Sequence, residues 1–127
     1  VGGIAGMNID LDEEIKTIYI MPDVGYFIQP NLLTEWGVNW IKYLDSDYDP
    51  DMTFNIGVRY FLPSTTGGRP YIGYAIDSWG DYNEIHMKIG LFYPIATNVY
   101  IDSVIDYNWT DFDTDVDLKF GIAYFLY

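Results

Sequence analysis

The stretch VDLKFGIAYFL, residues 116–126, decides the fold class of this chain. Every second position from Val116 onward carries a large apolar residue, and the positions between them include Asp117, Lys119 and Gly121. A helix would scatter the apolar side chains around its circumference, whereas a β-strand places all of them on one face. The stretch therefore predicts a long amphipathic β-strand.

The same period of two runs through the rest of the chain. It recurs at residues 5–11, 18–28, 32–40, 54–61, 72–77, 84–93 and 99–108. Short segments of turn-forming or acidic composition separate these stretches, as expected where hairpins join antiparallel strands. We therefore predict an all-β chain of about eight antiparallel strands in a closed up-and-down barrel. We expect a single domain over residues 1–127.

The connections between the predicted strands are of two alternating kinds. Turns without charged residues lie at residues 29–31, 63–68 and 94–98. Acidic connections lie at residues 10–14, 45–51, 79–81 and 110–115. Successive connections of an up-and-down barrel lie at opposite ends, so we expect one neutral end and one end with short acidic loops.

The composition of the two strand faces predicts the environment of the barrel. One face of the strands combines alanine, aromatic residues and isolated charges with a series of glycines. These glycines are Gly25, Gly37, Gly57, Gly73, Gly90 and Gly121. Small residues suit the narrow lumen of an eight-stranded barrel. The opposite face is rich in Ile, Leu, Val and Tyr and exceeds the apolar surface that a soluble monomer exposes. We therefore predict a polar, glycine-rich lumen and an apolar outer wall that faces hydrocarbon.

The charged residues of the inward face are predicted to form a network across the lumen. Its candidate members are Asp23, Glu35, Arg59, Asp77, Lys88, Asp102, Asp117 and Lys119. We expect buried ion pairs between neighbouring strands, such as Glu35 with Arg59 and Lys88 with Asp102. Because eight strands leave room only for side chains, this network should fill the lumen rather than line a pore.

Aromatic residues of the outward face form a predicted belt that contacts lipid headgroups or a partner protein. The belt consists of Tyr26, Trp36, Trp40, Tyr60, Tyr74, Tyr93, Tyr107 and Tyr124.

One acidic connection has the spacing of a cation-binding loop. Asp45, Asp47, Asp49 and Asp51 alternate like the start of a calcium loop, but the glycine and glutamate of an EF-hand are absent. The two interpretations are a solvated acidic loop and a weak divalent-cation site for Ca²⁺. No other cofactor is expected.

His86 is the one histidine of the chain and the natural candidate for a catalytic base. A serine nucleophile must approach a histidine to about 3 Å, but Ser78 and Ser103 have the parity of the outward face while His86 faces the lumen. We therefore predict that the chain is not an enzyme and that His86 is a hydrogen-bond partner in the lumen.

Composition excludes several classes of function. The chain has a formal net charge of −13 and no cysteine, so nucleic-acid binding, disulfides and thiolate metal sites are not expected. No apolar run approaches the roughly 20 residues of a membrane helix, so a membrane form must be a closed barrel. The residues after Val1 lack the features of a signal peptide, and we expect a mature or non-exported sequence.

Three short motifs resemble the small outer-membrane β-barrel family, the OmpA/OmpX-like class of eight-stranded barrels. They are residues 22–33, which combine a strand, a short turn and a strand, residues 58–61 (VRYF), and the glycine-aromatic end GIAYFLY at residues 121–127. The resemblance implies the Gram-negative outer membrane, with the neutral turns in the periplasm and the acidic loops outside. In this class the terminal aromatic residue is recognised by the insertion machinery. The short outer loops depart from family members that bind receptors or phage, so an adhesive role is not expected.

The leading function hypothesis is a structural outer-membrane barrel without channel activity, with membrane lipid or detergent as its partner. One alternative is the same barrel assembled with copies of itself into an oligomer or extracellular filament. Further alternatives are a soluble, lipocalin-like ligand carrier and a lipid-modifying barrel enzyme. A requirement for detergent distinguishes the first from the soluble forms, and inactivation by His86→Ala would identify the enzyme.

Overall fold

The computed structural model describes residues 3–12, 17–44, 49–64, 67–78, 83–110 and 113–126. These residues form eight strands. The strands are β1 (Gly3–Asp12), β2 (Thr17–Gln29), β3 (Leu32–Tyr43), β4 (Asp51–Phe61), β5 (Arg69–Ser78), β6 (Asn83–Ala96), β7 (Val99–Trp109) and β8 (Thr114–Leu126). Within these ranges, no helix is long and apolar enough to cross a membrane.

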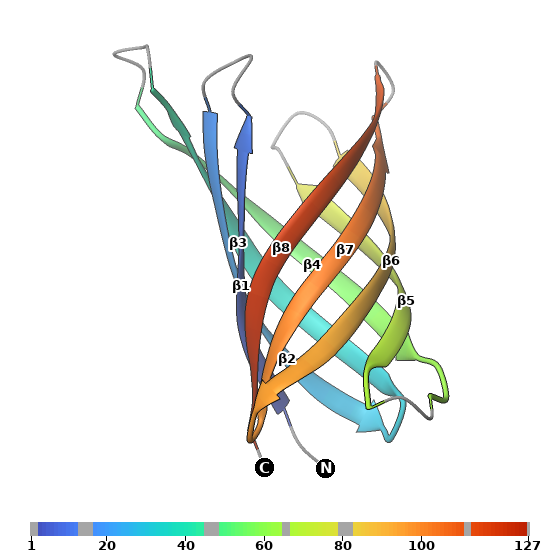
Figure 1. Ribbon diagram of the computed structural model, residues 1–127. Helices are drawn as coiled ribbons and strands as arrows, with labels where there is room; N and C mark the ends of the chain where they lie inside the picture. Colours follow the sequence, from blue (N-terminus) through green and yellow to red (C-terminus); the bar gives the residue numbers. More distant parts are fainter. Residues whose placement is uncertain are drawn as a thin grey trace.

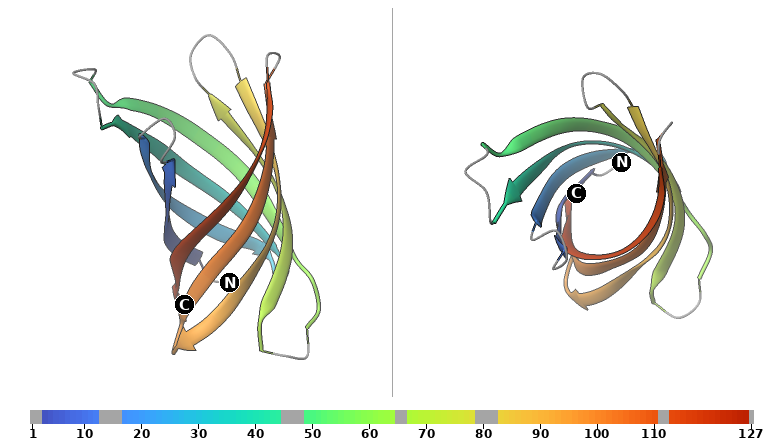
Figure 2. Two further views of the ribbon diagram at one scale, coloured as in Figure 1. Left: turned by 45° about the horizontal axis from the view of Figure 1, so that its top comes forward. Right: turned by 90° about the horizontal axis from the view of Figure 1, so that it is seen from above.

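The strands form one closed antiparallel barrel, as the alternation of the sequence predicts. Each strand pairs with the next, and β8 pairs with β1 over the register from Gly3 opposite Leu126 to Ile9 opposite Phe120. The closed ring is visible along the barrel axis in Figure 2. β1 begins and β8 ends at the same end of the barrel, at the bottom of Figure 1.

The neutral turns lie at the end where β1 begins (Figure 1). Two of them are two-residue turns, at residues 30–31 and 97–98, and Asn98 has a φ of 61°, a left-handed conformation that asparagine tolerates. The turn predicted over residues 94–98 is shorter than expected, because β6 continues through Pro94 to Ala96. The β6–β7 register shifts between Pro94 and Ala96, and such a bulge accommodates a proline that cannot donate to the ladder.

Parts of the predicted acidic connections belong to strands. β1 extends to Asp12, β4 begins at Asp51 and β8 begins at Thr114. Residues 45–48 and 79–82 lie outside the described part of the chain.

The orientation of the strand faces follows the prediction. Ile89 on β6 and Phe120 on β8 are 66% and 55% exposed, while Phe92 and Leu33 are fully buried in the interior. Hydrophobic side chains therefore cover the outside, and the interior contains both aromatic and charged side chains.

Candidate functional site: the lumen

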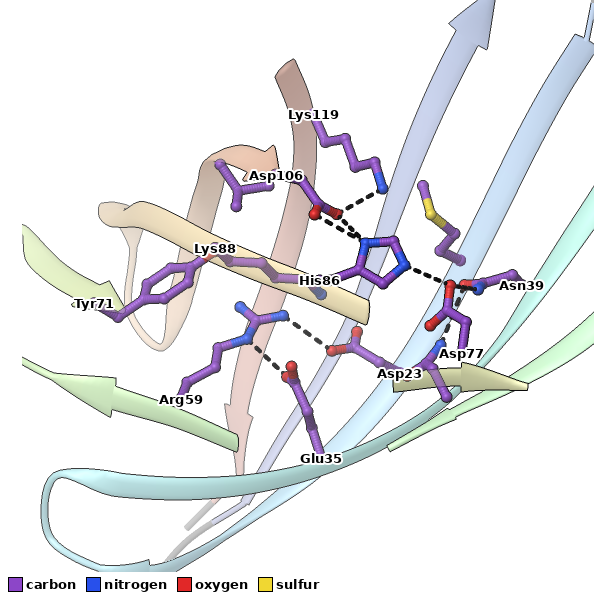
Figure 3. Close-up of a pocket in the computed structure, with 13 residues that line it drawn as sticks. Asp23, Glu35, Asn39, Arg59, Tyr71, Asp77, His86, Lys88, Asp106 and Lys119 are labelled. Carbon is purple, nitrogen blue, oxygen red and sulfur yellow. Dashed lines mark hydrogen bonds and ion pairs between the residues drawn. The ribbon is translucent and has the colours of Figure 1, made fainter. Parts of the chain in front are cut away.

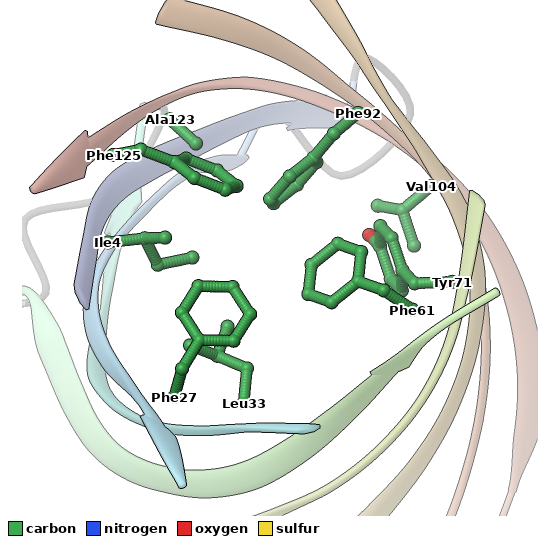
Figure 4. Packing of buried hydrophobic residues seen from close by; sticks show 9 residues of the cluster. All are labelled: Ile4, Phe27, Leu33, Phe61, Tyr71, Phe92, Val104, Ala123 and Phe125. Atoms are coloured by element: carbon green, nitrogen blue, oxygen red, sulfur yellow. The ribbon is translucent and has the colours of Figure 1, made fainter. Parts of the chain in front are cut away.

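Hydrophobic side chains, most of them aromatic, pack together inside the barrel at the end with the neutral turns. This aromatic layer consists of Ile4, Phe27, Leu33, Phe61, Tyr71, Phe92, Val104, Ala123 and Phe125, with Tyr100 packed against it. Figure 4 shows the side chains of the layer, without Tyr100, pointing into the barrel from several strands. The ring centroids of Phe61 and Phe92 are 5.4 Å apart, and those of Tyr71 and Phe92 are 5.3 Å apart, which are favourable distances for tilted and edge-on rings.

A cation lies within this aromatic layer. The guanidinium of Arg69 is 4.7 Å from the ring centre of Phe61 and 5.1 Å from that of Phe125. These distances allow cation–π attraction with both rings. Arg69 was not predicted as a site residue. The sequence does contain a signal for the aromatic layer, because inward-facing aromatic residues recur in several strands near the end that leads to a neutral turn.

Arg59 on β4 is the centre of the first charged cluster. Its Nη1 lies 3.0 Å from Asp102 on β7, its Nη2 lies 3.4 Å from Asp23 on β2, and its Nε lies 2.7 Å from Oε2 of Glu35 on β3. The Nε–H direction misses the Glu35 oxygen, so this contact is an ion pair without an aligned hydrogen bond. The Arg59 side chain is buried, and three carboxylates surround its single positive charge.

Tyr71 connects the aromatic layer to this charged cluster. Its hydroxyl donates a hydrogen bond of 2.7 Å to Asp102, and the guanidinium of Arg59 lies 4.8 Å from the centre of its ring. Asp102 therefore receives hydrogen bonds from both Tyr71 and Arg59.

His86 on β6 is the centre of the second charged cluster (Figure 3). Its Nδ1 lies 2.9 Å from both carboxylate oxygens of Asp106 on β7. Its Nε2 lies 2.9 Å from Asp77 on β5 and 2.8 Å from Glu84 on β6. Lys119 on β8 lies 2.9 Å from Asp106 and completes the cluster on that side.

Amide side chains extend the second cluster across the lumen. Asn39 donates a hydrogen bond of 2.7 Å to Asp77, and its Nδ2 also lies 3.1 Å from the hydroxyl of Thr53. Asn55 in turn donates to Asn39, and Asn108 donates to Asp117. These polar groups are satisfied inside the barrel, as the burial of polar groups requires.

A small cavity separates the two charged clusters. Its volume is about 30 Å³, and its lining includes Glu35, Arg59, Lys88, His86 and Asp106. A volume of this size holds about two water molecules. Charged side chains of both clusters therefore line this cavity, which has room for isolated waters.

The eight residues predicted for the charge network all lie on the inward face, with side chains that are buried or partly buried. The expected pair of Glu35 with Arg59 is present. The expected pair of Lys88 with Asp102 is wrong. In the β6–β7 register, Asp102 lies opposite Phe92 and Lys88 lies opposite Asp106, so Asp102 binds Arg59 across the lumen instead.

The aromatic residues predicted for the outer belt lie on the outer face. Trp40 is partly buried, and the others are exposed: Tyr26, Trp36, Tyr60, Tyr74, Tyr93, Tyr107 and Tyr124.

The predicted calcium residues fall only partly within the described chain. Asp45 and Asp47 lie outside the described residues, and Asp49 and Asp51 are exposed. Asp51 accepts a hydrogen bond of 3.0 Å from the hydroxyl of Tyr43.

The serines considered as nucleophiles do not form a catalytic pair with His86. Ser78 is exposed at the end of β5, and both imidazole nitrogens of His86 lie within hydrogen-bond distance of carboxylates. The histidine therefore has the surroundings of a buried ionic cluster rather than those of a serine hydrolase.

Several solved structures share this fold. No protein-family model matches the chain, and no curated protein matches its sequence. The N-terminal β-barrel domain of Pseudomonas aeruginosa OprF superimposes with a TM-score of 0.72 at 13% identity, over 99% of this chain and 100% of that one. A de novo designed transmembrane β-barrel gives a TM-score of 0.72 at 15% identity, over 98% and 95% of the two chains.

Neisserial surface protein A gives a TM-score of 0.61 at 16% identity, over 97% of this chain and 94% of that one. At these identities the similarity establishes the fold. The chain therefore has the closed eight-stranded fold of the small outer-membrane barrels that its sequence resembles.

Proposed function

We propose that this chain is a non-enzymatic structural barrel of the Gram-negative outer membrane, with a wall that faces lipid and a lumen that is plugged by side chains. The observation that carries this proposal is the continuous apolar wall. Each strand contributes exposed hydrophobic side chains to it, for example Met7, Tyr26, Trp36, Ile56, Ile72, Ile89, Ile105 and Phe120.

The contrast between wall and lumen supports a membrane environment. Water would favour the opposite arrangement, with the charged residues outside and the isoleucines inside. In hydrocarbon the apolar wall is favourable, and a closed barrel leaves no unpaired strand edge.

The filling of the lumen supports a role without conduction. The aromatic layer closes one half of the barrel, and the clusters around Arg59 and His86 occupy the other half. A cavity of about 30 Å³ between them is too small for a continuous water column.

The proposed orientation has the neutral turns in the periplasm and the acidic ends of the hairpins outside. It rests on the sequence resemblance and on the common position of the start of β1, the end of β8 and the neutral turns at one end of the barrel (Figure 1).

Refolding without detergent, in detergent and in phosphatidylcholine vesicles tests the proposal. We expect a β-rich, heat-modifiable monomer only in detergent or vesicles, and no conductance steps in planar bilayers. A monodisperse soluble protein that binds a hydrophobic dye without detergent would instead indicate a ligand carrier. Detergent-free fibres would indicate the self-assembling alternative.

A further inference from the structure

Three potential metal ligands converge at the end of the β5–β6 hairpin opposite the aromatic layer. Glu84 and His86 are two residues apart on β6 and therefore share the inward face, and Asp77 lies directly opposite Glu84 on β5. Their ligand atoms all lie within 4.8 Å of one another. The side chain of Glu84 is 21% exposed, so the cluster is accessible from this end of the barrel.

The spacing of the ligand atoms is close to that of a tetrahedral metal site. Oxygen and nitrogen ligands about 2.0–2.1 Å from a zinc ion are separated by roughly 3.3 Å in a tetrahedron. Nε2 of His86 lies 2.9 Å from Asp77 and 2.8 Å from Glu84. Each carboxylate oxygen would need to move away from Nε2 by roughly half an ångström to admit the ion.

The second nitrogen of the imidazole is already held as in a metal-bound histidine. Nδ1 faces both oxygens of Asp106, which is anchored in turn by Lys119. A carboxylate that accepts the Nδ1 proton directs Nε2 toward a metal and makes it a better ligand. Asn39 similarly fixes Asp77 through a hydrogen bond to its Oδ2.

The charge balance of the lumen favours a bound cation. On the side of the aromatic layer that contains the charged clusters, the inward carboxylates with buried or partly buried side chains include Asp23, Glu35, Asp77, Glu84, Asp102, Asp106 and Asp117. The lysine and arginine side chains that face them there are Arg59, Lys88 and Lys119. A divalent cation bound among these carboxylates would compensate part of this excess of negative charge.

We propose that His86, Asp77 and Glu84 bind a zinc-class divalent transition-metal ion, with Asp106 as the positioning residue and water as the remaining ligand. The imidazole nitrogen selects this class of ion over Ca²⁺ and Mg²⁺, which prefer oxygen ligands. Asp49 and Asp51 of the acidic connection are exposed and are not among these three ligands.

Titration of the refolded barrel with zinc chloride tests this site. We expect one zinc ion per chain by calorimetry, no competition from millimolar Ca²⁺ or Mg²⁺, and a shift of the imidazole NMR signals on zinc addition. These signals are unambiguous because the chain contains one histidine. Absence of zinc binding, or binding that leaves the His86 signals unchanged, would overturn the proposal.

Variants at the ligands separate this site from other acidic groups. Glu84→Gln should weaken zinc binding at least about 10-fold, and Asp106→Asn about 10- to 100-fold. Asp51→Asn, which alters an exposed carboxylate, should leave the affinity unchanged. His86→Gln should abolish zinc binding. If this variant fails to fold, Glu84→Gln provides the test, because the Glu84 side chain is partly exposed and its substitution should disturb folding less. Wild-type affinity in folded Glu84→Gln would refute the assignment.

Discussion

The ring of Tyr71 lies over Gly90, its direct partner across the β5–β6 ladder, so closely that a Cβ atom at position 90 would overlap the ring. This contact places the Tyr71 ring in the aromatic layer and its hydroxyl on Asp102. The absence of a side chain at position 90 therefore determines how the two halves of the lumen are connected.

Gly90→Ala should lower the free energy of unfolding by about 1–3 kcal/mol, because the added methyl group displaces the Tyr71 ring from a packed lumen. Urea titration of the barrel in vesicles measures the loss. Gly73→Ala is the matched control, since its nearest new contact, at 3.3 Å, is much less severe. Equal losses in the two variants would contradict the role of the ring contact.

Tyr71→Phe keeps the ring over Gly90 but removes the donor to Asp102. We expect a loss of about 1–3 kcal/mol in unfolding free energy, as for a buried acceptor that loses its partner. Tyr74→Phe removes an outward hydroxyl on the same strand and should change stability by no more than about 0.5 kcal/mol. An unchanged free energy of unfolding in Tyr71→Phe would show that the Tyr71 hydroxyl does not stabilise Asp102.

Arg59→Ala should lower the free energy of unfolding by about 3–5 kcal/mol, more than either of the two preceding substitutions, because it leaves buried carboxylates without their cation. Those carboxylates are Glu35, Asp102 and Asp23. Lys42→Ala serves as the control, since Lys42 is exposed at the end of β3. The unfolding midpoints of the two proteins in detergent should differ clearly, and equal small shifts would contradict the buried position of Arg59.

A charge introduced into the outer wall should lower the free energy of unfolding more, the closer it lies to the middle of the bilayer. Ile89→Arg, near the middle of β6, should destabilise the barrel in vesicles by about 2–4 kcal/mol, and Val116→Arg, near the start of β8, by about 0–1 kcal/mol. Both native side chains are exposed, so loss of packing is similar. Equal losses of unfolding free energy for the two arginine variants would contradict a wall that faces lipid.

The strands and their faces could be predicted because a period of two is a local property of the chain. The alternation of residues 116–126 places Phe120 and Lys119 on opposite faces, and the glycines and isolated charges of the Lys119 face identify it as the inward one. The closed barrel was predicted from the number of such strands, their short connections and their apolar outer face, and the structure confirms it.

The contacts across the lumen could not be predicted from this alternation. Arg59 binds Asp102 from β4 to β7, a pairing that depends on the register and tilt of every strand between them. The same dependence made the pairing of Lys88 with Asp102 wrong. The convergence of His86, Asp77 and Glu84 was not predicted either, because it depends on the β5–β6 register that places Asp77 opposite Glu84.

The most direct test of the account is the lipid accessibility of successive positions along β8. The chain has no cysteine, so single cysteines at Asp117, Leu118, Lys119, Phe120 and Ile122 can each carry a spin label in vesicles. We predict that oxygen dissolved in the lipid relaxes the labels at positions 118, 120 and 122 strongly and those at 117 and 119 weakly. A reversed alternation, or equal relaxation at all positions, would contradict an apolar wall that faces lipid.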